Sequence, residues 1–300
     1  MKLSDNMTAA LLMMTSMAGF TLNDAMLKMM AGQVPLYQLL FLRGLFTTVV
    51  VGIIAWRVRA FRHTVSRSDW VVISVRTLAE ILAAYLFLTA LFHMPLANVT
   101  AIMQALPLTL TLAAALFLKE PLGWRRLAAI AVGFVGVMLI VRPGTGGFNA
   151  FSLYGLGAVA CVTLRDLVTR RLSRDVPSML VTFVTSLAIM VVFGVASLAN
   201  AWAPMAAREW GLLLTSSVFV IGGYLTSIMV MRVGEISFVA PFRYTSLIWA
   251  LCLGWLLFGD WPAPIVLLGA GIVAGSGAFT LYREARLRRR MMSRPDLHRR

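Results

Sequence analysis

Long apolar segments recur along the whole chain, and they constrain its fold more than any other feature. Each run has roughly the 20 residues that a helix needs to cross a bilayer, and only short charged or Pro/Gly-containing breaks separate them. The runs cover residues 7–29, 36–56, 69–92, 95–118, 124–141, 152–172, 178–199, 210–231, 236–258 and 262–282. This pattern predicts an all-α integral membrane protein with ten transmembrane helices.

The composition supports the membrane class. Hydrophobic residues make up 60% of the chain and charged residues 13%, with a mean hydropathy of +0.84. A soluble protein carries roughly 25% charged residues, so this chain has too few charges to cover a soluble surface. The first run is too long for the apolar part of a cleaved signal peptide, and we expect it to stay in the membrane.

The basic residues predict the orientation. With the N-terminus in the cytoplasm, 20 of the 27 lysines and arginines lie on the cytoplasmic side, and only Lys28, Arg142 and Arg208 lie outside. Cytoplasmic loops carry such an excess, so both termini are predicted to be cytoplasmic. The net charge of +15 therefore indicates membrane topology and not a nucleic-acid partner. Two interpretations of the basic tail at 284–300 stay open: binding of anionic lipid headgroups, or topology alone.

An internal duplication is visible at a nearly constant offset. Thr21-Leu22-x-Asp24 corresponds to Thr163-Leu164-x-Asp166, and Val34-Pro35 corresponds to Val176-Pro177, 142 residues later. At an offset of 140, further matches are Asp69-Trp70 with Glu209-Trp210 and Leu118-x-Glu120 with Phe258-x-Asp260.

Each copy contains five predicted spans, and an odd number of spans inverts the second copy in the bilayer. We expect a first five-helix repeat at 1–145, a second at 150–283 and a basic cytoplasmic tail at 284–300. Inverted repeats are a construction of secondary transporters, whose substrate site lies between the halves near the midplane.

The segment FLKEPLGWRRLAAIAVGFVGVMLIVRPG at 117–144, its copy at 258–283 and Arg43 in Phe-Leu-Arg resemble the EamA-type modules of the drug/metabolite transporter superfamily. The resemblance covers nearly the whole chain and implies two five-helix modules that export small metabolites. Within the superfamily the chain most resembles the YddG-type exporters of aromatic and other amino acids. The second half departs from the pattern, with Thr185 at the position of Arg43 and Asp260-Trp261 in place of Glu-Pro.

Three charges within predicted spans are candidates for substrate binding. Arg43 and Arg76 lie about seven residues inside their spans, roughly 10 Å deep, and Glu80 lies near the midplane. Arg76 and Glu80 are four residues apart and share a helix face. They either line an aqueous cavity, where they bind the carboxylate and ammonium of a zwitterion or carry a proton, or they neutralise each other between helices.

Asp24 is a fourth candidate, near the outer end of the first span and one turn from Lys28. Its repeat equivalent, Asp166, lies beside Arg165. For both, the alternative to a binding role is an interfacial helix end stabilised by nearby cations.

The fourth span carries a polar stripe of Thr100, Gln104 and Thr111, and its Pro107 lacks an N–H and leaves a carbonyl unpaired one turn earlier. The stripe is compatible with a substrate site and hinge or with interhelical hydrogen bonds. Pro241 offers a second hinge, and Tyr244 is the repeat equivalent of Gln104. Tyr85 and Trp249 are candidate aromatic walls for an apolar substrate side chain.

Small residues at a spacing of four predict close helix packing in the fifth and tenth spans. The residues concerned are Ala129, Gly133 and Gly136 in one span and Gly271 and Gly275 in the other. The pattern is compatible with packing within one chain or between two chains in a homodimer.

The sequence contains no metal-binding His spacing, nucleophile elbow or phosphate-binding loop, so we expect no enzyme activity, no metal and no cofactor. A secondary transporter of small metabolites, with amino acids first among them, is the leading interpretation. Another substrate of the same superfamily and a channel-like facilitator are the alternatives. The expected partners are the substrate and membrane lipids, and the expected location is a bacterial inner membrane.

Overall fold

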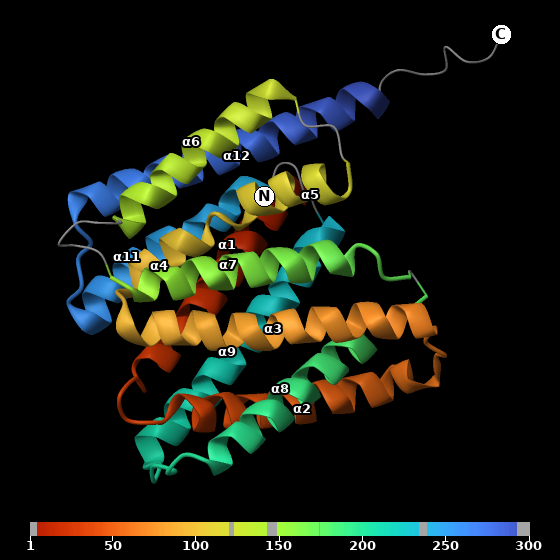
Figure 1. The fold of residues 1–300 in the computed structure, drawn as a ribbon, viewed down its shortest axis with the longest axis vertical. Helices are drawn as coiled ribbons and strands as arrows, with labels where there is room; N and C mark the ends of the chain where they lie inside the picture. Colours follow the sequence, from red (N-terminus) through yellow and green to blue (C-terminus); the bar gives the residue numbers. More distant parts are fainter. Residues whose placement is uncertain (1–4, 120–122, 143–148, 174, 234–238, 293–300) are drawn as a thin grey trace. The chain divides into compact units, whose positions relative to one another are not determined.

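The computed structural model of the 300-residue chain describes residues 5–119, 123–142, 149–173, 175–233 and 239–292, which are helical and contain no strand. In chain order the elements (Figure 1) are α1 (Asp5–Lys28), α2 (Leu36–Arg57), η1 (Ala60–Arg62), α3 (Arg67–His93), α4 (Leu96–Met103), α5 (Leu106–Phe117), α6 (Trp124–Val141), α7 (Phe151–Thr169), α8 (Ser178–Leu198), α9 (Ala207–Val233), η2 (Ala240–Tyr244), α11 (Thr245–Phe258) and α12 (Pro264–Met292).

The helices follow the predicted apolar segments, except that α12 continues to Met292, into the predicted basic tail. Among the described residues, seven helical segments are long and apolar enough to cross a membrane. Two shorter apolar helices, Leu127–Val141 and Pro264–Thr280, lie in the fifth and tenth predicted spans. An all-helical membrane architecture is therefore confirmed. The count of ten crossings and the cytoplasmic position of both termini stay predictions.

The chain forms two compact units, and each unit combines segments of both sequence repeats. Unit 1 contains Met1–Leu22, Thr100–Phe148 and Phe219–Arg300, and unit 2 contains Asn23–Val99 and Asn149–Val218. The two compact units therefore do not coincide with the sequence repeats, and the division into five-helix repeats at 1–145 and 150–283 stays a prediction.

Two antiparallel helix pairs build unit 2: α3 with α7, and α2 with α8 (Figure 1). Asn149 beside α7 donates to the His93 carbonyl at one end of α3, and Asp69 at the other end of α3 accepts from the Ser173 N–H beyond α7. The backbones of α2 and α8 approach so closely that a Cβ at Gly44 would lie 3.0 Å from the Met190 Cα.

The repeated Val-Pro pairs each precede one of these helices. Pro35 is the residue before α2 and Pro177 the residue before α8, because a fixed proline φ and an absent N–H suit the start of a helix. The second helices of the two repeats thus begin at equivalent residues and run antiparallel to each other, as an inverted duplication requires.

Buried polar side chains fasten the loops of unit 2. At the start of α3, the N-cap Ser66 accepts from the Asp69 N–H, while the Asp69 carboxylate accepts from the Ser66 hydroxyl and from the Ser173 N–H. At the start of α2, the Gln38 amide donates to the Ala203 carbonyl and accepts from the Ala203 N–H, both at 2.9 Å. Gln38 therefore holds the segment between α8 and α9.

Replacing Gln38 with leucine is expected to loosen this segment. The substitution removes both partners of the Ala203 backbone, and an unsatisfied buried polar group costs about 1–3 kcal/mol. We expect a lower unfolding temperature in detergent and faster hydrogen exchange at residues 199–206. The exposed Gln33 provides the matched control, since Gln33→Leu removes no buried contact. Equal exchange rates in the two variants would contradict the role of Gln38.

In unit 1, α6 and α12 form an antiparallel pair, with Gly136 opposite Gly269 and Gly133 opposite Ser276. The first half of α1 crosses the second half of α9, where Ser16 Oγ donates to the Gly223 carbonyl at 2.7 Å. Small residues allow these backbones to approach, and interhelical hydrogen bonds of this kind are common in membrane proteins.

Candidate functional site

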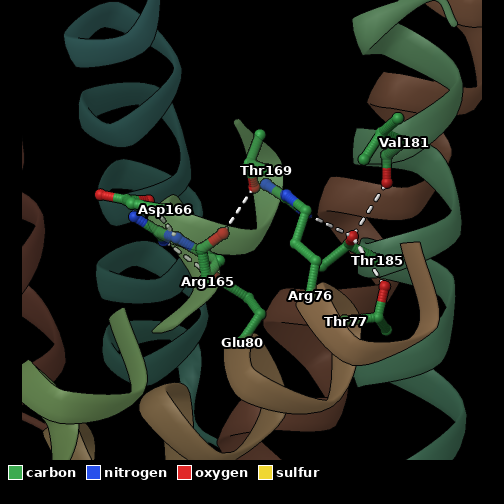
Figure 2. Close-up of polar contacts among 8 residues, drawn as sticks. All are labelled: Arg76, Thr77, Glu80, Arg165, Asp166, Thr169, Val181 and Thr185. Carbon is green, nitrogen blue, oxygen red and sulfur yellow. Dashed lines mark hydrogen bonds and ion pairs between the residues drawn. The ribbon is translucent and has the colours of Figure 1, made fainter. Parts of the chain in front are cut away.

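A charge network joins α3 and α7 within unit 2 (Figure 2). Arg165 Nη1 donates to Glu80 Oε2 at 2.7 Å, and Arg165 Nε donates to Asp166 Oδ1 at 2.8 Å. About a quarter of the Glu80 and Arg165 side chains is exposed, and 40% of Asp166. One guanidinium thus bridges two carboxylates that both keep some access to their surroundings.

Arg76 lies one turn before Glu80 on α3, and its side chain extends to α8 (Figure 2). Arg76 Nη1 donates to Thr185 Oγ1 at 2.8 Å, and the hydroxyls of Thr185 and Thr77 lie 3.2 Å apart. Thr185 also donates to the Val181 carbonyl at 2.9 Å. Position 185 is the repeat equivalent of Arg43, so a guanidinium from α3 binds where the second repeat lacks its own arginine.

These contacts extend beyond the Arg76–Glu80 pair considered from the sequence. The two residues are one turn apart on α3, as predicted, and Glu80 also forms an ion pair with Arg165 of the second repeat. Asp166, for which a helix-end role was one of two interpretations, belongs to the same network.

Asp24 lies in α1 next to Asn23, whose Nδ2 donates to Asp24 Oδ1 at 2.8 Å. The same arrangement occurs at Asp166, whose carboxylate accepts from the side chain of the preceding residue, Arg165. Arg43 of α2 acts electrostatically on Asp24. Lys28, one turn beyond Asp24, donates to the Leu91 and Met94 carbonyls at the end of α3.

In unit 1, interruptions of regular α-helix occur at both predicted hinges. α4 ends at Met103, α5 begins at Leu106, and Pro107 lies in the first turn of α5, where it supplies no N–H to the Met103 carbonyl. Pro241 lies in the first turn of η2, a 3₁₀ helix that precedes α11. Movement at these positions stays a prediction.

Gln104 connects the two interrupted regions of unit 1. Its side-chain amide donates to Ser246 Oγ and, at 3.3 Å, to the Arg243 carbonyl. This is interhelical hydrogen bonding, one of the two interpretations of the polar stripe. Thr111 donates to the Pro107 carbonyl of its own helix at 2.7 Å.

Tyr244, the repeat equivalent of Gln104, is buried, and its hydroxyl faces Gly277 of α12. Within the described residues this hydroxyl has no hydrogen-bond partner. Tyr244 also lines an apolar groove of about 490 Å³ between η2–α11 and α12, together with Leu247, Leu251 and Ala270. The lining suits hydrocarbon better than a charged substrate.

The two aromatic candidates differ in their surroundings. Tyr85 stacks on Tyr37 with ring centroids 6.1 Å apart, and Tyr37 stacks on Phe193 of α8 at 6.3 Å. Trp249 is an exposed residue of α11. The structure therefore places Tyr85 in a packed aromatic row and Trp249 on a surface.

The glycines predicted to pack helices together also differ in their surroundings. Gly133 and Gly136 of α6 face α5 and α12, and a Cβ at Gly136 would lie 2.8 Å from the Gly269 carbonyl oxygen. Gly271 and Gly275 lie on an exposed face of α12, where a Cβ would meet no described atom within 4 Å. The α12 glycine at the contact with α6 is Gly269.

Sequence reasoning did not select Arg165 or Thr185. The position of Arg165 inside a predicted span could have identified it, because an arginine there requires a partner or water. Its partner was not readable, because Glu80 lies 85 residues earlier. No group of three or more His, Cys, Asp or Glu side chains that could hold a metal ion occurs in the described part of the chain.

Comparison with known proteins identifies the family of this chain. The EamA-like transporter family matches residues 7–142 and 150–282, so each match covers one sequence repeat. The chain is 30% identical over 219 residues to the riboflavin transporter of Vibrio cholerae, which covers 72% of this chain and 73% of that protein.

Two further relatives cover more of the chain. The S-adenosylmethionine uptake transporter of Rickettsia bellii is 25% identical over 274 residues, covering 90% of this chain and 91% of that protein. The pseudopaline exporter CntI of Pseudomonas aeruginosa is 23% identical over 260 residues, covering 85% and 89%.

A solved crystal structure has the same fold, with a TM-score of 0.61 at 21% identity, covering 95% of this chain and 99% of the other. The duplicated family match, the apolar helices and the antiparallel pairing of equivalent helices agree. The chain belongs to the EamA-like transporter family and is a multi-pass membrane transporter of small molecules.

Proposed function

We propose that the chain is a secondary transporter of small zwitterionic metabolites, with amino acids and compounds that carry an amino-acid group first among them, and that export is its physiological direction. The observation that carries the proposal is the bridging of Glu80 and Asp166 by Arg165 inside apolar helices. Glu80 lies at the middle of α3, and a charge at the centre of a transmembrane helix costs about 2.5–3.5 kcal/mol on insertion scales, so such a charge marks a functional site.

The charges of the site suit a zwitterion. On α3, Arg76 and Glu80 supply one positive and one negative charge, one turn apart. On α7, the adjacent residues Arg165 and Asp166 supply a second charge of each sign. A substrate carboxylate can replace a protein carboxylate on Arg165 while the substrate ammonium binds the released Glu80. Every charge keeps a partner during this exchange, which avoids the cost of an unpaired buried charge.

One of the relatives supports this class of substrate. S-adenosylmethionine, which the Rickettsia relative takes up according to its name, bears the ammonium and carboxylate of methionine. Another relative is a riboflavin transporter, and riboflavin is a neutral metabolite, so a transport assay needs riboflavin as a comparison substrate. The relatives include both an uptake transporter and an exporter, so direction is part of the test.

The inverted repeat supports alternating access as the mechanism. Secondary transporters with such repeats open their site to each side in turn and use interrupted helices near it. Because the chain contains no phosphate-binding loop, the gradient of the substrate or of a coupled ion supplies the energy.

Counterflow in proteoliposomes tests the proposal. Vesicles loaded with unlabelled methionine are diluted into labelled methionine, phenylalanine, S-adenosylmethionine or riboflavin, with and without a pH gradient. We expect saturable entry of the zwitterions, blocked by excess methionine. N-Acetylmethionine lacks the ammonium and methionine methyl ester lacks the carboxylate, so neither is expected to compete. Entry of riboflavin alone, or equal competition by both analogues, would contradict a zwitterion site.

A further inference from the structure

The turn after α2 brings three arginines and two aromatic rings around one depression. Its volume is about 370 Å³, and its lining residues are Trp56, Arg57, Arg59, Phe61 and Arg62. None of them belongs to the charge network of α3 and α7. The basic count predicts that this end of α2 faces the cytoplasm.

The backbone of this turn is held by contacts that do not involve the guanidinium groups. Arg59 has a φ of 57°, in the left-handed region, and reverses the chain between α2 and η1. The Arg59 N–H donates to the Trp56 carbonyl, and the Arg62 N–H donates to the Arg59 carbonyl. Ala60 is buried with Ala55 and Leu180, which fixes the turn against α8.

Phe61 adds a second anchor, because its ring meets Phe183 of α8 edge-on with centroids 5.1 Å apart. The three arginines are therefore presented together by a folded turn. A topology signal alone requires only basic residues in a loop and no particular conformation.

Within the described residues, the charges of this turn have no internal partner. Residues 57–68 contain no aspartate or glutamate, and the following carboxylate, Asp69, is buried and accepts from Ser66 and Ser173. In the described part of the chain, no ion pair or hydrogen bond engages the guanidinium groups of Arg57, Arg59 or Arg62. Three like charges around one depression favour an anion between them, and the planar fork of arginine matches the geometry of a phosphate.

An exposed apolar stripe leads along α2 to the depression. Leu45, Val49, Ile53 and Trp56 follow at spacings of three and four, and Trp56 is 73% exposed at the end of the stripe. Tryptophan is enriched at the headgroup level of membranes, and an exposed stripe on a transmembrane helix contacts acyl chains. The stripe and the arginines thus match the two parts of one phospholipid.

We propose that this depression binds the phosphate of an anionic phospholipid, whose acyl chains lie along the stripe of α2. The phosphate contacts the three guanidinium groups, and Trp56 and Phe61 flank the glycerol region. This lipid site is separate from the transport site and does not depend on the proposed function.

The test measures the unfolding temperature of purified full-length protein in detergent during titration with phosphatidylglycerol or zwitterionic phosphatidylcholine. We expect a saturable rise with phosphatidylglycerol only. Replacing Arg57, Arg59 and Arg62 with glutamine is expected to weaken the apparent affinity at least about tenfold, since each basic residue near an anionic surface contributes to binding. The matched control removes three other basic charges outside the depression, by Arg67→Gln, Arg125→Gln and Arg171→Gln.

The outcomes separate the sources of the effect. An equal phosphatidylglycerol response in the depression variant and the control variant would overturn the site, as would an equal response to both lipids in the unsubstituted protein. An equal rise with inorganic phosphate alone would overturn the lipid as ligand and indicate a soluble phosphate compound. If the triple variant does not fold, Arg62→Gln alone leaves the left-handed Arg59 in place and is expected to weaken the response.

Discussion

Replacing Arg165 with glutamine is expected to lower counterflow of a zwitterionic substrate roughly tenfold to a hundredfold, because a hydrogen bond to a charged group is worth about 1.5–3 kcal/mol. Arg165 bridges Glu80 and Asp166 at 2.7 and 2.8 Å, so glutamine leaves two carboxylates without their cation. Arg165→Lys keeps the charge but loses the planar fork, and we expect an intermediate rate. The measurement is the initial rate of labelled methionine entry in proteoliposomes with equal amounts of reconstituted protein.

Glu80 distinguishes substrate recognition from a purely structural pair. In Glu80→Gln, Arg165 keeps Asp166 as a partner, so we expect the protein to fold and the KM for methionine to rise. The preference for methionine over N-acetylmethionine is expected to fall, because the group that binds the ammonium is neutral. The exposed Arg208 supplies a charge-removing control in the Arg208→Gln variant. Full counterflow in Arg165→Gln, with unchanged discrimination in Glu80→Gln, would sink the zwitterion site.

Replacing Gly269 with valine is expected to destabilise the pair of α6 and α12 by about 1–3 kcal/mol or more, the range for overpacked interiors. A Cβ at Gly269 would lie 2.6 Å from the Gly136 carbonyl oxygen and 3.1 Å from the Leu139 Cβ. The nearest of these atoms belongs to the backbone, so the helices must separate to admit the side chain. The unfolding temperature in detergent, followed by circular dichroism, measures the effect.

The control lies on the same helix. At Gly271 an added Cβ meets no described atom within 4 Å, so Gly271→Val is expected to unfold close to the unsubstituted protein. Both substitutions change glycine to valine in α12, so their effects on helix propensity are similar and the difference reports packing. Equal destabilisation by the two variants would contradict the assignment. A loss that occurs only in Gly271→Val and depends on protein concentration would instead indicate a contact between two chains.

These glycines show where sequence reasoning stops. The small-x-x-x-small pattern selected Gly133, Gly136, Gly271 and Gly275. Gly133 and Gly136 do face α12, but the α12 glycine at this contact is Gly269 and not Gly271 or Gly275. Spacing along a helix identifies residues that share a face. It does not say which face meets a neighbour, because that depends on the rotation of each helix about its axis.

The charge network shows the same limit. The spacing of Arg76 and Glu80 correctly placed them one turn apart on α3. Their partners, Thr185 and Arg165, lie on α8 and α7, more than 80 residues later in the chain. Only the antiparallel packing of α3 against α7 brings Glu80 to Arg165.

The sequence by itself determined the helical membrane class, the duplication and the helix starts at Pro35 and Pro177, because hydropathy and local backbone preference act over about 20 residues or fewer. The tertiary structure alone decided that each folded unit combines helices of both repeats and that Arg165 joins Glu80 to Asp166. Such contacts depend on which helices lie side by side. Which helices pair is decided by the close packing of whole helix surfaces, and no single segment of the sequence contains enough information to predict it.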